Sequence, residues 1–352
     1  MRTFAERVSQ SLIDLSPAWF AGCRAFLIDG TTMTLAPTSS LRAAYPPATN
    51  QHGETLWPVM LMVAHELQSG CALIPEFGAM YGPDNTSEAR QAAAMGRRIP
   101  RGSLVLADAG FGIFSVAHAM LGAGHDILFR LTTTRFKSLR RQAEILDRTA
   151  HHVHYRLTWA PSAKDRQTNP HVPAKARAEV FLHEVELANG TRLYLVTTLA
   201  VPCDVAAQYY GRRYDVEHDI RDMKVSLGIE NIRAQSDEMV QKELLCSVVA
   251  YHLVVPLRRE AAKLAGVEPR RLSFTGVWTT MQVCLLQQLT CSASEWLERY
   301  ERAVRSAADH QLPNRLGRSY PRRAHPCRTK STKFMQQHTK KLTPHELSKK
   351  PK

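Results

Sequence analysis

Two short apolar stretches of this 352-residue chain each run into an aspartate, and this limits the folds that the chain can adopt. Asp29 interrupts the stretch AFLIDGTTMTL (25–35), and Asp108 follows LVLA (104–107). Both stretches are rich in apolar and β-branched residues and predict β-strands. A carboxylate on or beside a buried strand is costly unless it is paired or binds a cation. Aspartates followed by glycine also form ordinary turns, so each position alone leaves both readings open.

The surrounding pattern alternates strand-like and helix-like segments, which is typical of an α/β domain. Two strands, 56–67 and 71–80, are predicted to join at Ser69-Gly70 and to form an antiparallel meander with the first strand. Further strands are predicted over 103–107 and 125–133, and helices over 1–22, 85–98 and 114–121. Thr86 or Ser87 is the expected cap of the helix at 85–98.

From residue 134 the pattern of apolar and polar residues changes. Residues 134–200 hold short alternating stretches around a polar loop, which predicts a small β-rich insertion and not a continuation of the α/β core. After it, the pattern is helical to residue 308. Helices are predicted over 205–227, 238–264 with a kink at Pro256, 275–289 and 294–308.

The net charge of +14 favours a polyanionic partner. Residues 313–352 hold twelve Lys or Arg against one acid, so they supply +11 of that charge. Because they are also rich in proline and serine, they predict a flexible basic arm that follows a phosphate backbone, or else a solvated solubility tail. The sequence shows neither a signal peptide nor an apolar run of the roughly 20 residues that span a bilayer, so we expect a cytoplasmic protein with no membrane partner.

A stripe of functional side chains lies on the helix predicted at 205–227. Tyr210, Arg213, Glu217 and Lys224 fall at about 0, −60, −20 and −40° when about 100° is allowed for each residue. One aromatic ring, two cations and one carboxylate therefore share a narrow face. An ordinary solvated face with pairs such as Arg213–Glu217 is the plainer interpretation.

Other polar residues carry no motif. Asp219 and Asp222 lie on the same predicted helix but point away from the stripe, at about 200 and 140°, and we expect them to be solvated. The seven cysteines are scattered singly, without the paired spacing of a zinc or redox site. The sequence has neither a P-loop nor the G-x-S-x-G motif of hydrolases.

Three carboxylates from two strands and a helix would form an oxygen-rich site suited to Mg²⁺ or Mn²⁺. Two such ions, about 3.5 to 4 Å apart, can activate a water or a 3′-hydroxyl in phosphodiester displacement. Cations on the same helix face would hold phosphates of the scissile strand, and Tyr210 could stack on a base or bond a phosphate. The candidate metal ligands are Asp29, Asp108 and Glu217.

The sequence resembles the DDE transposases of bacterial insertion sequences, in the family marked by a Y-x2-R-x3-E-x6-K signature. Four residues match that signature at every spacing: Tyr210, Arg213, Glu217 and Lys224. Three further stretches resemble the first-aspartate motif, the second-aspartate motif and the strand before the signature helix, namely LIDGTT (27–32), LADAGF (106–111) and LYLVTTL (193–199). The resemblance extends from about residue 25 to the basic tail.

The resemblance implies a ribonuclease-H-like mixed sheet flanked by helices, with a β-rich insertion and a helical C-terminal part. It implies metal-dependent DNA cleavage and strand transfer at the ends of an insertion sequence, by dimers that pair two ends. Asp29, Asp108 and Glu217 would be catalytic metal ligands, and Tyr210, Arg213 and Lys224 would contact double-stranded DNA. The expected parts are an N-terminal helix (1–24), a core (25–133 and 201–312), the insertion (134–200) and the tail (313–352).

Two other readings of the chain stay open. Members of that family usually carry a larger helical domain before the first aspartate, whereas only 28 residues precede Asp29. The chain could therefore be a truncated DNA-binding remnant without catalysis. A nuclease of the same fold, which cuts without joining, would use the same ions and carboxylates.

Overall fold

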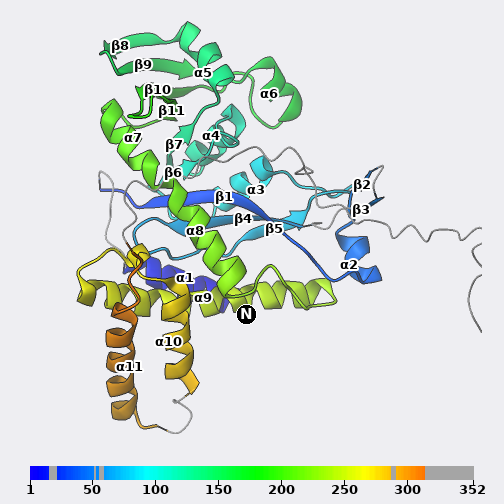
Figure 1. Ribbon diagram of the computed structural model, residues 1–352. Coiled ribbons are helices and arrows are strands. Elements are labelled where there is room, and N and C mark those ends of the chain that lie inside the picture. Colours follow the sequence, from blue (N-terminus) through cyan, green and yellow to red (C-terminus); the bar gives the residue numbers. More distant parts are fainter. Residues whose placement is uncertain (16–21, 51–52, 55–58, 287–290, 314–352) are drawn as a thin grey trace, which may run out of the picture.

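One mixed sheet of nine strands organises the molecule (Figure 1). The computed structural model describes residues 1–15, 22–50, 53–54, 59–286 and 291–313. The strand order across the sheet is β5-β4-β1-β6-β7-β11-β10-β9-β8. The strands are β1 (Ala25–Met33), β4 (Val59–Glu66), β5 (Glu76–Ala79), β6 (Leu104–Ala107), β7 (Asp126–Arg130), β8 (Glu144–Arg148), β9 (His152–Trp159), β10 (Ala178–Glu186) and β11 (Arg192–Thr197), and β2 (Thr49–Asn50) and β3 (Gly53–Glu54) form a separate small hairpin.

The central five strands mix both directions of pairing. β1 is antiparallel to β4, and β4 is antiparallel to β5, which confirms the predicted meander. On its other side β1 is parallel to β6, and β6 is parallel to β7. The structure therefore confirms the expected α/β, ribonuclease-H-like mixed sheet, with β1 at the centre of its five strands.

The strands of the segment 134–200 extend this sheet. β11 pairs antiparallel with β7, and β10, β9 and β8 follow in turn, each antiparallel to its neighbour. The segment is rich in β-structure, as its alternating texture indicates. Its strands are nevertheless joined to the core by backbone hydrogen bonds, because Leu195, Val196 and Thr197 lie opposite the end of β7.

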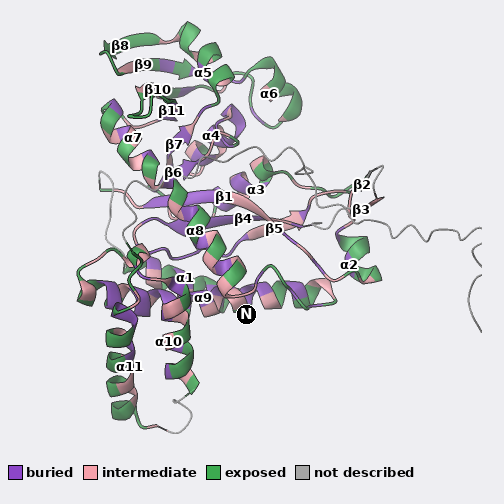
Figure 2. Ribbon diagram, in the orientation of Figure 1, coloured by how far each residue is buried: buried purple, intermediate pink, exposed green. Residues whose placement is uncertain are grey.

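Side chains of β1 and β6 alternate between two hydrophobic clusters, one on each face of the sheet. Phe26, Ile28 and Val105 belong to the larger cluster, whereas Leu27 and Leu106 belong to the smaller one. This is the period-two alternation of strand side chains, and β6 and the first half of β1 are buried on both faces of the sheet (Figure 2).

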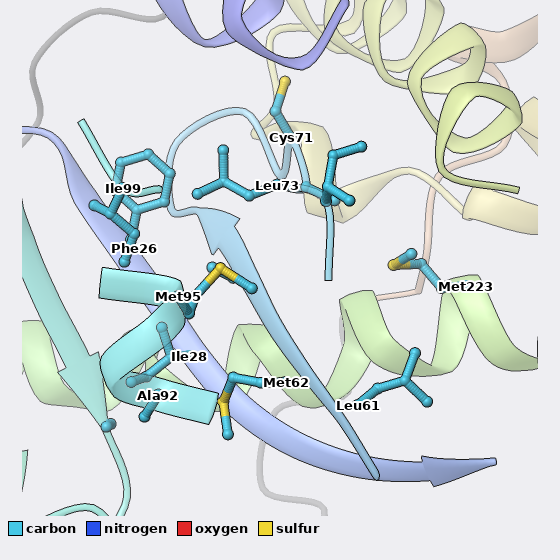
Figure 3. Close-up of a cluster of buried hydrophobic side chains, with 14 of the residues drawn as sticks. Phe26, Ile28, Leu61, Met62, Cys71, Leu73, Ala92, Met95, Ile99 and Met223 are labelled. Carbon is cyan, nitrogen blue, oxygen red and sulfur yellow. The ribbon is translucent and has the colours of Figure 1, made fainter. Parts of the chain in front are cut away.

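Two pairs of helices cover these faces. On the larger cluster, α3 (Glu88–Gly96) brings Ala92 and Met95 against Phe26 and Ile28 (Figure 3). Helix α3 packs on α4 (Phe114–Gly122), and Ser87 caps α3 by accepting a hydrogen bond from the Arg90 N–H. The smaller cluster is covered by α7 (Cys203–Gly211) and α8 (Asp215–Arg221).

Helices α1, α10 and α11 pack around α9 (Asp237–Ala265), which contains Pro256. By length and composition α9 could cross a membrane, but half of its most apolar window is buried inside this fold, as in the core helix of a globular domain. It contacts α1, α10 and α11. The other helices are α1 (Arg2–Asp14), α2 (Ser39–Ala44), α5 (Thr133–Leu139), α6 (Ala163–Thr168), α10 (Phe274–Leu286) and α11 (Ala293–Ala308). The predicted basic arm lies almost entirely outside the described residues.

Candidate active site

The two aspartates that interrupt the apolar stretches lie on neighbouring strands. β1 and β6 are parallel, and Leu27 is paired with Leu106. Two residues further along each chain come Asp29 and Asp108, so both carboxylates stand at the same level of the sheet. Asp29 lies within β1, whereas Asp108 follows the last residue of β6. Strand register thus brings together two residues that are far apart in sequence.

The helical segment predicted over 205–227 is present from Cys203 to Ser226, but it is not a regular α-helix throughout. Two irregular turns interrupt it, because the backbone first tightens to a 3₁₀ turn and later widens to a π-turn. The order is α7, the 3₁₀ turn Arg212–Tyr214, α8 and the π-turn Asp222–Ser226. Arg213 and Lys224 each lie in one of these turns, and Glu217 lies in α8 between them.

Arg213 connects the carboxylates of the strand and the helix. Its Nη2 lies 2.6 Å from Glu217 Oε1, and its Nη1 lies 3.5 Å from Asp29 Oδ2. The Arg213 side chain is only 8% exposed, whereas that of Glu217 is 45% exposed. The largely buried guanidinium of Arg213 therefore links the partly exposed carboxylate of Glu217, on α8, to Asp29 on β1.

The environment of Asp29 opposes its negative charge. Burial raises the pKa of Asp29 to about 6, and repulsion from Asp108 and Glu217 adds to the rise. A hydrogen bond from the Gly30 N–H, 2.8 Å long, and the charge of Arg213 act in the opposite direction without cancelling it. All three predicted carboxylates thus lie close enough to interact, and Arg213 compensates the negative charge of Asp29 only in part.

Lys224 ties the far end of the signature segment to β1. Its Nζ donates to the backbone oxygen of Thr32 at 2.9 Å and lies 3.4 Å from Thr31 Oγ1. Both acceptors follow Asp29 within the same strand. The two cations of the predicted stripe therefore contact β1 on either side of Glu217.

The two tyrosines beside this segment differ in exposure. Tyr210, predicted to contact DNA, is 4% exposed and packs in the smaller hydrophobic cluster, and its burial raises the pKa of its hydroxyl. Tyr214 is 54% exposed, and the guanidinium of Arg213 lies 4.7 Å from its ring centroid. Tyr214 is thus the aromatic ring that faces solvent here, while the DNA contact of Tyr210 stays a prediction.

A fourth carboxylate, Glu88, lies between Gly30 of β1 and Gly110 in the turn after β6. A Cβ added at Gly30 would lie 2.7 Å from Glu88 Oε1, and one added at Gly110 would lie 3.9 Å from Glu88 Oε2. Burial raises the pKa of Glu88, and the charge of Asp108 adds to the rise. In the sequence Glu88 resembles an ordinary acid in the first turn of a helix, so no pattern indicates its place beside the site.

The expectation that Asp219 and Asp222 are solvated was wrong. Asp219 is fully buried and accepts two hydrogen bonds from Arg270, the shorter 2.7 Å long. Its Oδ2 also lies 3.7 Å from His65 Nδ1. Asp222 is half-buried beside Arg258, and burial raises its pKa to about 7. The face of the helical segment opposite the stripe therefore carries internal ion pairs, Asp219 with Arg270 and Asp222 with Arg258.

Within the part of the chain that the structure describes, no three His, Cys, Asp or Glu side chains converge closely enough to form a preassembled metal cage. The guanidinium of Arg213 lies between Asp29 and Glu217, where it supplies positive charge to both carboxylates. The carboxylates and the strands that carry them nonetheless meet at one end of the sheet.

The model of the transposase DDE domain matches residues 22–253, which include Asp29, Asp108 and Glu217. The chain belongs to this family. DDE transposases generally use divalent metal ions.

Comparison with individual proteins adds less. No curated protein matches the sequence of this DDE domain. Among solved structures, the cryo-EM structure of the piggyBac transposase synaptic complex with hairpin DNA is similar at 9% identity and a TM-score of 0.42. That alignment covers 84% of this chain and 59% of the piggyBac transposase chain. This chain therefore spans less than two thirds of the length of that transposase.

Proposed function

We propose that this chain is a transposase that cuts DNA at the ends of an insertion sequence and joins those ends to a target. The proposal rests on one observation: Asp29, Asp108 and Glu217 lie close enough to interact electrostatically, and all three are within the segment that matches the DDE family. The proposed catalytic core comprises 25–133 and 201–312, with 134–200 as an insertion that extends the sheet.

The proposed cofactor is Mg²⁺ or Mn²⁺, in two sites. Carboxylate oxygens are the donors that these ions prefer, and the raised pKa of Asp29 indicates a site in need of positive charge. Asp29, Asp108 and Glu217 would hold the ions. When bound, two such ions supply activation of a water or a 3′-hydroxyl and neutralise charge on the displaced oxygen.

The chain's own cations would position the DNA strand. Arg213 and Lys224 flank Glu217, so their positive charges lie where phosphates of a strand at the carboxylates would pass. Tyr214 is exposed beside them and offers a ring on which a base can stack. The proposed DNA contact of Tyr210 rests on its match to the signature alone, because its side chain is buried.

The proposed partners are the double-stranded ends of the element and the target DNA. The net charge of +14 supports a polyanionic partner. We further propose that the transposase acts as a homodimer that pairs two ends, in the bacterial cytoplasm where chromosomal and plasmid DNA lie. The basic residues of 314–352 would add contacts to the phosphate backbone.

A plasmid cleavage assay tests this function. A supercoiled plasmid that carries the DNA flanking this gene is incubated with the full chain and Mg²⁺ or Mn²⁺, beside an EDTA control. Asp108→Ala is the site variant, and Asp84→Ala, at an exposed position outside the site, is the matched control. We expect metal-dependent cuts at defined positions with wild type and Asp84→Ala, and none with Asp108→Ala or EDTA.

The same assay separates the competing readings. Salt-sensitive binding without cleavage would indicate a DNA-binding remnant. Cleavage without joined products would indicate a nuclease of the same fold. Cleavage by Asp108→Ala at the wild-type rate would contradict the proposed site.

A further inference from the structure

Gly30 follows Asp29 within β1, at a position where the backbone itself does not require glycine. It pairs with Met62 of β4 in extended strand geometry, which any residue can adopt. A glycine inside a strand weakens it and commonly marks a close approach by another group. Here that group is the side chain of Glu88, because a Cβ added at Gly30 would lie 2.7 Å from Glu88 Oε1 and 3.3 Å from Glu88 Cγ. The missing side chain at position 30 therefore leaves the space that Glu88 occupies.

Glu88 and Glu217 approach the end of the sheet from opposite faces. Position 30 lies on the same face of β1 as Ile28, because successive residues of a strand alternate between the faces. Helix α3 covers that face, and Ala92, one turn after Glu88, packs against Ile28 (Figure 3). Helix α8, which carries Glu217, covers the other face. Carboxylates therefore reach this end of the sheet from both of its faces.

The carboxylate of Glu88 also lies near that of Asp108. Asp108 Oδ1 accepts a hydrogen bond from the Gly110 N–H, 2.7 Å long. A Cβ added at Gly110 would lie 3.0 Å from Asp108 Oδ1 and 3.9 Å from Glu88 Oε2, so both carboxylates lie within 4 Å of one point beside Gly110. Partial burial and the charge of Asp108 raise the pKa of Glu88, and among the described residues no positive charge offsets these effects. A bound cation would relieve this repulsion.

Glu88 also fits a plainer role as an acid in the first turn of α3. Ser87 caps this helix, and a negative charge next to the cap interacts favourably with the N-terminal end of the helix dipole. That role requires only a charge near the helix end. It explains neither the space left at Gly30 nor the approach of Glu88 to Asp108.

We propose that Glu88 is a fourth carboxylate of the metal site and that residue 30 is glycine in order to admit it. Glu88 remains accessible to solvent, so it acts through water molecules on the ion held at Asp108, as a positioning residue. Mg²⁺ usually keeps several bound waters, and groups that bind around the ligands of an ion tune its affinity. This inference rests on the proposed metal site and adds to it a residue outside the signature.

Calorimetric titration of the full chain with Mn²⁺, without DNA, tests the inference apart from catalysis. Glu88→Gln keeps the shape of the side chain and removes its charge. Gly30→Ala displaces the carboxylate, because the three nearest neighbours of the added Cβ are all side-chain atoms of Glu88. The third variant combines both changes. The controls are Asp84→Asn, at an exposed position before α3, and Gly122→Ala, in α4, where an added Cβ has no neighbour within 4 Å.

We expect each single variant to weaken Mn²⁺ binding on the order of tenfold, as when a group beside a metal ligand is lost. The double variant should also lose about tenfold and not a hundredfold, because both changes act on the same carboxylate. The two controls should bind as wild type does. Thermal unfolding in EDTA should show no marked loss of stability in Gly30→Ala, since the added Cβ meets only the end of a flexible side chain.

The outcomes separate this inference from the proposed function. Wild-type Mn²⁺ affinity in Glu88→Gln would overturn the inference and retain a site of Asp29, Asp108 and Glu217 alone. A hundredfold loss in the double variant would show that Gly30 acts independently of Glu88, and would overturn the reason given for the glycine. No Mn²⁺ binding by wild type would overturn the metal site and the inference together. Non-additive losses in the variants would support the inference even if the plasmid assay showed no cleavage.

Discussion

Glu217 and Asp219 lie two residues apart on the same helix, α8, in opposite environments. The Glu217 side chain is 45% exposed and shares Arg213 with Asp29, at the open end of the sheet. Asp219 is fully buried and paired with Arg270 at 2.7 Å. Burial acts to raise the pKa of Asp219, but Arg270 and His65 together hold it below its usual value. At Asp29, by contrast, burial and repulsion outweigh Arg213, and the pKa rises.

The difference separates carboxylates that hold the fold together from carboxylates that remain available to a ligand. On the inner face of α8, Asp219 meets both a cation and hydrogen-bond donors, as a buried charge requires. On the outer face Arg213 pairs with Asp29 and Glu217 and Asp108 adds repulsion, so the negative charge of Asp29 is only partly compensated. Perturbed groups of this second kind are characteristic of functional sites.

The largest expected effect is on the inner face. Asp219→Ala should lower the free energy of unfolding by about 3–5 kcal/mol, because it leaves Arg270 buried without its partner. Glu217→Ala should change the free energy of unfolding by less than about 1 kcal/mol, since Glu217 is partly exposed. Urea unfolding followed by circular dichroism measures both. A similar loss of unfolding free energy in the two variants would show that the inner and outer faces of α8 do not differ in this way.

The next effect has the opposite sign and depends on pH. Because the pKa of Asp29 is higher in the folded protein than in the unfolded chain, ionisation of Asp29 costs stability as the pH rises from about 4 to about 6. Asp29→Asn removes that cost. In EDTA at pH 7.5 it should raise the free energy of unfolding by about 1–2 kcal/mol, after allowance for the weakened contact with Arg213.

The gain from Asp29→Asn should vanish near pH 4, where the wild-type carboxyl is protonated in both states. Asp219 predicts the reverse trend, because its lowered pKa means that its contribution is lost on acidification. Urea midpoints at several pH values test both trends. A loss of stability in Asp29→Asn at pH 7.5 would show that Asp29 is a structural ion pair like Asp219.

A smaller effect, on the metal requirement, is expected at Glu88, which lies between Gly30 of β1 and Gly110 after β6. Glu88→Gln should raise the Mg²⁺ concentration needed for half-maximal cleavage on the order of tenfold, as when a group beside a metal ligand is lost. Asp84→Asn, at an exposed position just before α3, is the control and should have no effect. An unchanged Mg²⁺ requirement in Glu88→Gln would show that Glu88 does not contribute to the metal site.

The sequence indicated most of the central sheet because its strands are apolar and bounded by turns. It could also single out Asp29 and Asp108, since acidic residues are costly in such strands. It could not show that the two are adjacent, because that depends on the parallel register of Leu27 with Leu106. The pairing of β11 with β7 is likewise a long-range contact that alternation within either strand does not encode.

The sequence was least informative about the inner face of α8. A helical projection places Asp219 away from the stripe but does not reveal what packs against it. Its partner Arg270 lies 51 residues further along the chain, in a 3₁₀ turn. The 3₁₀ and π turns were not predicted either; they contain Arg213 and Lys224, whose contacts with Asp29 and Thr32 of β1 are long-range.

The central claim is that the outer carboxylates form a metal site, and calorimetric titration with Mn²⁺ tests it most directly. Wild type should bind Mn²⁺, and Glu217→Gln should weaken that binding on the order of tenfold or more, because it removes a charged oxygen donor. Asp84→Asn should bind as wild type does. Equal Mn²⁺ affinity in wild type and Glu217→Gln would contradict the account.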